Sequence, residues 1–175
     1  KRDLYKNMYD RAINVINNSK KINKLNIIFE ELEVDIKNIS KVLPKQLIHR
    51  DPHTSNFIMK QNELVGIIDF EIAEENIRIF DICYCATSIL NEVFSDHKFR
   101  QEWITFVGKL LNGYNSINQL FENEVNSIWH TMLYIQTIFM AYFIDYPNIF
   151  DLNKDMFLWI YENKNNIEMN ILTPQ

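Results

Sequence analysis

Apolar residues three or four positions apart dominate the first part of the chain, and this is the spacing of side chains on one face of an α-helix. One such row covers residues 4–16 and a second covers residues 25–39. Pro44 follows the second row, and proline lacks the backbone N–H that the interior of a helix needs. The pattern therefore predicts two helices ahead of Pro44.

A different pattern follows, with short apolar runs at residues 57–59 and 64–68. A polar stretch, residues 60–63, separates them, and two short apolar runs divided by a polar turn are typical of a β-hairpin. Asn56 stands immediately before the first run and Asp69 immediately after the second. A hairpin would therefore bring these two polar residues together at its open end.

From Asp81 onward the apolar positions return to helical spacing, which predicts helices at residues 82–94, 99–114, about 117–144 and about 153–169. The longest apolar run, residues 129–144, is interrupted by polar residues and falls short of the roughly 18 to 20 residues that a membrane span needs. A buried helix is expected there. No repeat or linker divides the chain, so the predicted fold is one domain, residues 1–175, mainly α with a small β-hairpin.

Composition agrees with a helix-rich globular protein, because 47% of the 175 residues are hydrophobic and the chain holds only 3 Gly and 4 Pro. The net charge of −5 argues against nucleic acid as the main partner, since phosphate binding needs clustered Lys and Arg. Cys83 and Cys85 lie two apart in an apolar stretch, without further ligands at zinc-site spacing. They are expected to be buried free thiols in a reducing cytoplasm.

Three polar groups around the predicted hairpin meet the needs of phosphoryl transfer. That reaction uses a carboxylate to orient and deprotonate the attacking hydroxyl, and oxygen ligands to hold Mg²⁺ across the phosphates of a nucleotide. Asp51 stands five residues before Asn56, and Asp69 supplies a second carboxylate across the hairpin. Asp51, Asn56 and Asp69 therefore supply the groups that such a transfer requires.

The segments that carry these groups resemble the catalytic and metal-binding segments of the aminoglycoside phosphotransferase and choline kinase family, which has a protein-kinase-like fold. The resemblance rests on His-Arg-Asp-Pro-His-Thr-Ser-Asn at residues 49–56 and on Ile-Asp-Phe-Glu at residues 68–71. It continues through Arg-Ile-Phe-Asp-Ile at residues 78–82. It implies transfer of a phosphoryl group to a hydroxyl of a small molecule that is similar to an aminoglycoside, choline or homoserine.

The same resemblance implies a role for each residue of the cluster. Asp51 would be the catalytic base, and Asn56 and Asp69 would bind Mg²⁺ and, through it, ATP. His49 would brace the loop. Asp81 would lie at a helix start and bond back to the loop, and a plain helix N-cap is the simpler role for that residue; both roles can hold together.

Five positions depart from the family's pattern or have an open role. Arg50 stands where small-molecule kinases commonly have Gly, and it is interpreted as a solvated or loop-bracing side chain. His53 is expected to be an exposed loop residue, although it could approach a phosphate. Glu71 and residues 74–75 are interpreted as a solvated acidic turn, with binding of a metal or a cationic substrate as the alternative.

The sequence lacks the features that mark the nucleotide-binding half of such a kinase. Three glycines occur and no Gly-x-Gly, and helices rather than strands precede the cluster. We therefore expect the C-terminal lobe of a protein-kinase-like fold, with a small N-terminal lobe upstream of Lys1 and little activity in this piece alone.

Two alternatives to a small-molecule kinase remain. A protein kinase is disfavoured because only eleven residues separate Asp69 from Asp81 and no Ala-Pro-Glu follows Asp69. A non-catalytic binding domain with the same fold is the second alternative, and the intact Asp51, Asn56 and Asp69 argue against it.

Overall fold

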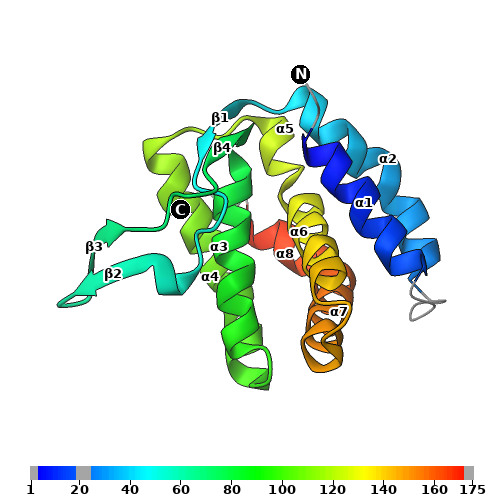
Figure 1. Ribbon diagram of the computed structural model, residues 1–175. Helices are drawn as coiled ribbons and strands as arrows, with labels where there is room; N and C mark the ends of the chain where they lie inside the picture. The colour runs from blue at the N-terminus through cyan, green and yellow to red at the C-terminus, as the bar shows by residue number, and fades with distance from the viewer. Residues whose placement is uncertain (1–3, 19–24, 172–175) are drawn as a thin grey trace.

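Two long helices begin the described part of the chain, which comprises residues 4–18 and 25–171 of the computed structural model. α1 (Leu4–Asn18) and α2 (Asn26–Val42) lie side by side (Figure 1), and they confirm the two helices predicted ahead of Pro44. Apolar residues of the predicted rows, among them Ile16 and Ile36, are fully buried. The rows therefore form the faces that pack into the core.

The predicted hairpin is present and projects from the helical body (Figure 1). It consists of β2 (Phe57–Lys60) and β3 (Glu63–Ile67), which pair antiparallel with each other. Gln61 and Asn62 form its turn, both with positive φ angles, of 52° and 65°. Such angles are those of the tight turns that match the twist of two strands.

A second antiparallel pair joins β1 (Lys45–Ile48) to β4 (Glu74–Ile77), and the sequence analysis predicted neither strand. Only Ile48 of β1 is buried, so β1 lacks the alternation of buried and exposed residues that marks a strand in sequence. The pairing brings the two ends of residues 49–73 together. The whole segment that carries the polar cluster is therefore closed at its base by a sheet.

Helices form the rest of the described chain, and two of the predicted boundaries are wrong. The helix predicted at about 117–144 is interrupted by residues 118–121, because Asn115 Oδ1 accepts a hydrogen bond from the backbone N–H of Leu120 and turns the chain. The last helix begins at Pro147, since proline is tolerated in the first turn of a helix, and is divided at Asn163. The helices are α3 (Ile79–Val93), α4 (His97–Ile117), α5 (Glu122–Val125), α6 (Ile128–Tyr142), α7 (Pro147–Glu162) and α8 (Lys164–Ile171).

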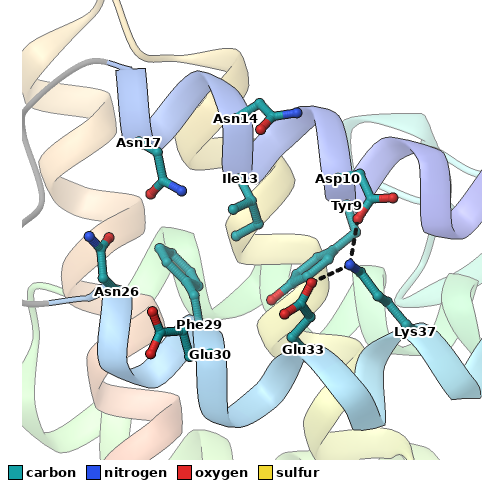
Figure 2. A pocket seen from close by; sticks show the side chains of 10 residues that line it. All are labelled: Tyr9, Asp10, Ile13, Asn14, Asn17, Asn26, Phe29, Glu30, Glu33 and Lys37. Carbon is teal, nitrogen blue, oxygen red and sulfur yellow. Dashed lines mark hydrogen bonds and ion pairs between the residues drawn. The ribbon is translucent and has the colours of Figure 1, made fainter.

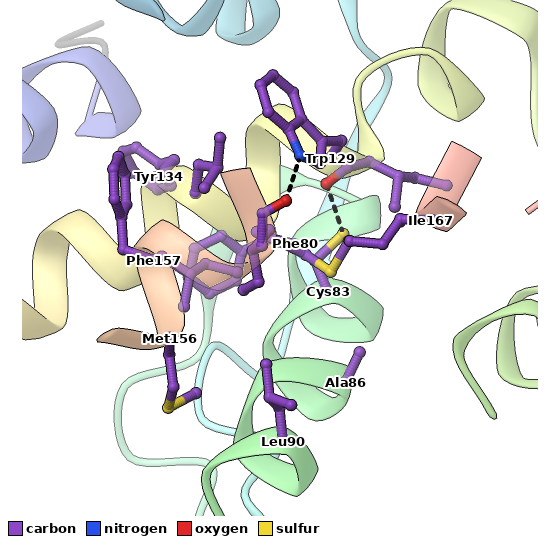
Figure 3. Packing of buried hydrophobic residues seen from close by; sticks show 14 of the residues in the cluster. Phe80, Cys83, Ala86, Leu90, Trp129, Tyr134, Met156, Phe157 and Ile167 are labelled. Atoms are coloured by element: carbon purple, nitrogen blue, oxygen red, sulfur yellow. Dashed lines mark hydrogen bonds between the residues drawn. The ribbon is translucent and has the colours of Figure 1, made fainter. Parts of the chain in front are cut away.

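The core lies where α3, α6, α7 and α8 meet. Figure 3 shows Phe80 of α3, Trp129 of α6, Phe157 of α7 and Ile167 of α8 packed together. The indole Nε1 of Trp129 donates to the carbonyl oxygen of Ile160 at 2.9 Å, so this buried polar atom is paired. α6 is thus the buried helix expected from the apolar run at residues 129–144. No helix within residues 4–18 and 25–171 has the length and apolarity that crossing a membrane requires.

Both cysteines are free thiols, as predicted, and the degree of burial differs between them. Cys83 is fully buried and Cys85 is half-buried. Burial raises the pKa of the Cys85 thiol to about 11 and raises the pKa of Cys83 as well. Both side chains are therefore protonated and unreactive near neutral pH.

The contact between α4 and α8 depends on a missing side chain at Gly108. A Cβ at Gly108 would overlap the backbone carbonyl oxygen of Asn170, whereas a Cβ at Gly113 would meet nothing within 4 Å. Gly108→Ala is therefore expected to lower the free energy of unfolding by about 1–3 kcal/mol, because the two helices must move apart. Gly113→Ala, the matched control, should raise it by about 0.5–1 kcal/mol, since Ala favours helix. Urea denaturation measures both changes, and equal stability of the two variants would contradict the close approach.

Candidate active site

The loop after β1 is held in place by the carboxylate of Asp81, in the first turn of α3. Its Oδ2 accepts a hydrogen bond from the backbone N–H of His49 at 2.7 Å, and its Oδ1 accepts one from Arg50 at 2.9 Å. Burial raises the pKa of Asp81, although these two hydrogen bonds act in the opposite direction. The contact to the loop is the one that the resemblance implied for Asp81.

Arg50 and Asp69 have a backbone conformation that is uncommon outside glycine. Their φ angles are 74° and 67°, in the left-handed region. This conformation explains why glycine suits position 50, and the hydrogen bond from Arg50 N–H to Asp81 helps to hold the arginine there. Backbone strain of this kind gathers at functional sites, where the surroundings fix an otherwise unfavourable conformation.

His49 joins the loop to the end of β3. Its Nε2–H donates to the carbonyl oxygen of Ile68 at 2.7 Å, and its Nδ1 accepts from the backbone N–H of Asp51 at 3.2 Å. The ring also lies against the ring of Phe70, with centroids 4.4 Å apart. A single buried imidazole therefore ties Asp51 to the residue before Asp69 and to the residue after it.

Asp51 is held through both of its carboxylate oxygens. The hydroxyl of Tyr84 donates to Asp51 Oδ1 at 2.6 Å, and Asn56 Nδ2 donates to Asp51 Oδ2 at 3.3 Å and to its carbonyl oxygen at 2.9 Å. Burial, followed by the hydrogen bond to Asp51, raises the pKa of Tyr84. Tyr84 therefore remains a protonated donor that orients the carboxylate at neutral pH.

Asn56 and Asp69 supply a donor set that suits Mg²⁺. The Nδ2 of Asn56 is engaged by Asp51, which leaves Oδ1 as the atom that could bind a cation. Asp69 is exposed and lines the same cavity as Asn56 and Asp51. Mg²⁺ commonly takes one or two protein oxygens and completes its shell with water and phosphate. In the described ranges no group of three or more His, Cys, Asp or Glu side chains could hold a metal.

Asp51, Asn56 and Asp69 line a cavity of about 410 Å³, within the size range of small-molecule sites. Helices α3, α6 and α7 contribute further polar side chains to its walls, namely Tyr84, Thr87, Ser88, Asn91, Gln136 and Asn153. Sequence analysis singled out none of these as site residues. In the sequence these residues look like ordinary helix residues. The only indication was that Tyr84 follows Asp81 by three residues, about one turn of helix, which places it on the same side of α3.

The residues with open roles divide between the loop and the cavity. Arg50 forms an ion pair with Glu74, with Nε and Oε1 3.3 Å apart, so Glu74 braces the loop instead of being solvated as expected. His53 lines the cavity with its Nδ1 3.0 Å from Ser55 Oγ. Glu71 is exposed.

A second cavity, of about 530 Å³, lies between α1 and α2 (Figure 2). Lys37 spans it, paired with Asp10 at 3.0 Å and with Glu33, and these hydrogen bonds raise the pKa of Lys37. The cavity shares no lining residue with the one at Asp51. The Asp10–Lys37 pair joins the two helices, whereas the Glu33–Lys37 pair lies within α2, and both have a structural role.

The loop, the hairpin and α3 all lie within the part of the chain for which a sequence comparison identifies a family. The profile of the phosphotransferase enzyme family matches residues 18–120, more than half of the chain and all of the polar cluster. The chain belongs to this family, as the resemblance predicted.

A curated relative is the homoserine kinase of Afipia carboxidovorans, which is 30% identical over 87 residues, corresponding to 50% of this chain and 25% of that protein. The chain therefore spans about a quarter of the length of the relative that it matches. No solved structure matches the chain.

Proposed function

We propose that the protein transfers the γ-phosphoryl group of ATP to a hydroxyl of a small molecule. The observation that carries the proposal is that Asp51, Asn56 and Asp69 line a single cavity. Membership of the phosphotransferase enzyme family and the similarity to a homoserine kinase support the reaction class.

Asp51 is proposed as the catalytic base. With its Oδ1 held by Tyr84, the carboxylate has a fixed orientation toward a hydroxyl in the cavity, and it can take the proton as the oxygen attacks phosphorus. Fixing the base before the substrate arrives reduces the reorganisation needed in the transition state.

Asn56 and Asp69 are proposed to bind the magnesium ion. A bound Mg²⁺ neutralises charge on the phosphates during the transfer. The chain would hold these two residues in position. The backbone N–H of Ile68 donates to the carbonyl oxygen of Asn56 at 3.0 Å, and His49 also bonds to Ile68, so the two ends of the hairpin are held together. The ligand atoms are therefore arranged before any metal binds.

The described helices and sheets are proposed to correspond to the large lobe of a protein-kinase-like fold. A mostly helical structure that carries the polar cluster, together with the lack of Gly-x-Gly in the sequence, supports this assignment. A small lobe would then supply the amides that cradle the triphosphate, so this chain alone should bind Mg²⁺ and ATP weakly.

A small acceptor is favoured over a protein. The eleven residues between Asp69 and Asp81 include β4, which pairs with β1 and so provides no long activation segment or peptide platform. A non-catalytic domain is the second alternative, and the restraint of Asp51 by two hydrogen-bond donors gives no support to a loss of function.

The full-length protein, supplied with ATP and Mg²⁺, should phosphorylate at least one member of a panel of amino alcohols, sugars, amino sugars and hydroxy acids. A coupled assay for ADP, with product detection by mass spectrometry, measures the transfer. Faster transfer to a protein substrate than to any small alcohol would contradict the small-molecule assignment, and binding without transfer would favour the non-catalytic alternative.

A further inference from the structure

We propose that Gln136 Oε1 accepts a hydrogen bond from the alcohol that is phosphorylated. The site would then select alcohols that carry a further N–H or O–H donor, and it would disfavour alcohols that carry a carboxylate. This inference rests on the proposed function, because it places the acceptor in the cavity beside Asp51. It adds the substrate's chemical class and a residue that determines it.

Gln136 carries a buried polar atom that lacks a partner. The residue lies on α6, is 1% exposed and lines the cavity, and its Oε1 forms no hydrogen bond within the described residues. Leaving a buried acceptor unpaired is unfavourable, so such atoms are rare in stable proteins. Neighbouring Thr131 and Thr137 on the same helix do have partners, since their hydroxyls donate to the carbonyl oxygens of Ser127 and Leu133. A donor from a ligand would satisfy Gln136.

Four other polar side chains on the helical walls each use a donor inside the protein. The hydroxyls of Thr87 and Ser88 donate to carbonyl oxygens one turn earlier on α3, at 3.0 and 2.9 Å. Asn153 Nδ2 donates to the carbonyl oxygen of Ile149 at 2.8 Å, and Asn91 Nδ2 donates to Met156 Sδ at 3.5 Å. Oxygen lone pairs on these side chains therefore remain for a ligand that brings hydrogens, while each Asn amide also keeps a second N–H.

The charges around the cavity favour the same class. Asp51 and Asp69 are negative, and neither Lys nor Arg lines this cavity in the part of the chain that the structure describes. A carboxylate placed here would face hydrogen-bond acceptors and find no Lys or Arg side chain to pair with. The magnesium ion proposed at Asn56 and Asp69 would be occupied by the phosphates of the nucleotide, so burying the carboxylate is costly. An amine or a second hydroxyl would instead find acceptors on several walls.

Matched compounds test the selectivity in the full-length protein. Homoserine is compared with homoserinol, in which a hydroxymethyl group replaces the carboxylate. Glucuronate is compared with glucose and glucosamine, which separate a neutral donor from a cationic one. Calorimetry measures binding in the presence of a non-hydrolysable ATP analogue, and the ADP assay measures turnover. We expect homoserinol, glucose or glucosamine to bind more tightly than its carboxylate counterpart.

Gln136→Met keeps the length of the side chain and removes the acceptor. It should raise the dissociation constant of the donor-bearing alcohol by about tenfold, with ATP affinity unchanged, because one hydrogen bond is lost. Its thermal unfolding midpoint should equal or exceed that of the wild type, since no internal hydrogen bond of Oε1 is lost. Gln101→Met, at an exposed position of α4, is the control and should change neither quantity.

Preference for the carboxylate compounds, unchanged binding in Gln136→Met, or a lower unfolding midpoint in that variant would each overturn the inference. The last result would mean that Gln136 has a structural role. A donor-bearing alcohol that binds through Gln136 but is not phosphorylated would refute the proposed function while leaving the selectivity intact.

Discussion

Asp51→Asn is expected to lower kcat by about 10²- to 10⁴-fold, the usual contribution of a positioned base. The side chain keeps its size but cannot take a proton, whereas the nucleotide contacts proposed above do not involve it. ATP affinity should therefore change little. Steady-state kinetics of the full-length protein with saturating acceptor measures both, and Asp155→Asn, an exposed residue of α7, serves as the control.

Asp69→Asn separates metal binding from base catalysis. Asparagine tolerates the left-handed φ of 67° better than alanine does, so this change tests the charge without adding backbone strain. It should raise the KM for the magnesium nucleotide as well as lower kcat. If Asp51→Asn kept near wild-type turnover, or if it weakened ATP as much as Asp69→Asn does, the assignment of the base would be wrong.

Arg78→Met is expected to lower the free energy of unfolding by about 3–5 kcal/mol, because it leaves a buried carboxylate without its cation. Arg78 Nε and Nη2 donate to the two oxygens of Glu124 at 2.6 and 2.5 Å, and Glu124 is 0% exposed. The guanidinium also donates to Asn118 Oδ1 and to the carbonyl oxygen of Gln119, both at 2.6 Å. One side chain thus joins the start of α3 to the connection between α4 and α6.

Urea denaturation of Arg78→Met and of the double variant Arg78→Met, Glu124→Met tests the mechanism. The double variant should be the more stable of the two, since no charge is left buried alone. Arg78→Lys should also be destabilised, because an ammonium cannot form the paired hydrogen bonds of a guanidinium. A single variant as stable as the wild type would show that the pair has no role in holding the segment.

Periodicity predicted the elements whose apolar face is broad. The rows at residues 4–16 and 25–39 and the run at 129–144 became α1, α2 and α6 because each buries a continuous stripe. β1 escaped prediction because its stability comes from pairing with β4, about thirty residues away, and a pairing partner leaves no local signal. The interruption at residues 118–121 was missed for a related reason, since Arg78 and Asn115 determine it through side-chain hydrogen bonds.

The candidate site residues of the loop and hairpin could be predicted from the sequence more readily than the residues of the cavity walls. Asp51, Asn56 and Asp69 stand at spacings that a hairpin converts directly into proximity, so local sequence contains the arrangement. Tyr84 and Gln136 enter the cavity from helices that are brought there by the packing of α3 against α6. Their significance depends on which atoms lack a partner, and that property exists only in the folded molecule.

Hydrogen bonds hold the base of the hairpin in place, whereas the tip is free to vary in length. In the described sheets β2 pairs only with β3, and Ile58, Met59, Leu64 and Val65 are exposed, so little tertiary packing supports the strands. The tip should open by local fluctuation more readily than the buried α6, and it is the place where proteolysis would begin. Insertions at the turn would lengthen the hairpin without changing the separation of its two ends. Length variation can therefore accumulate at this tip during evolution while the chemistry at the base is preserved.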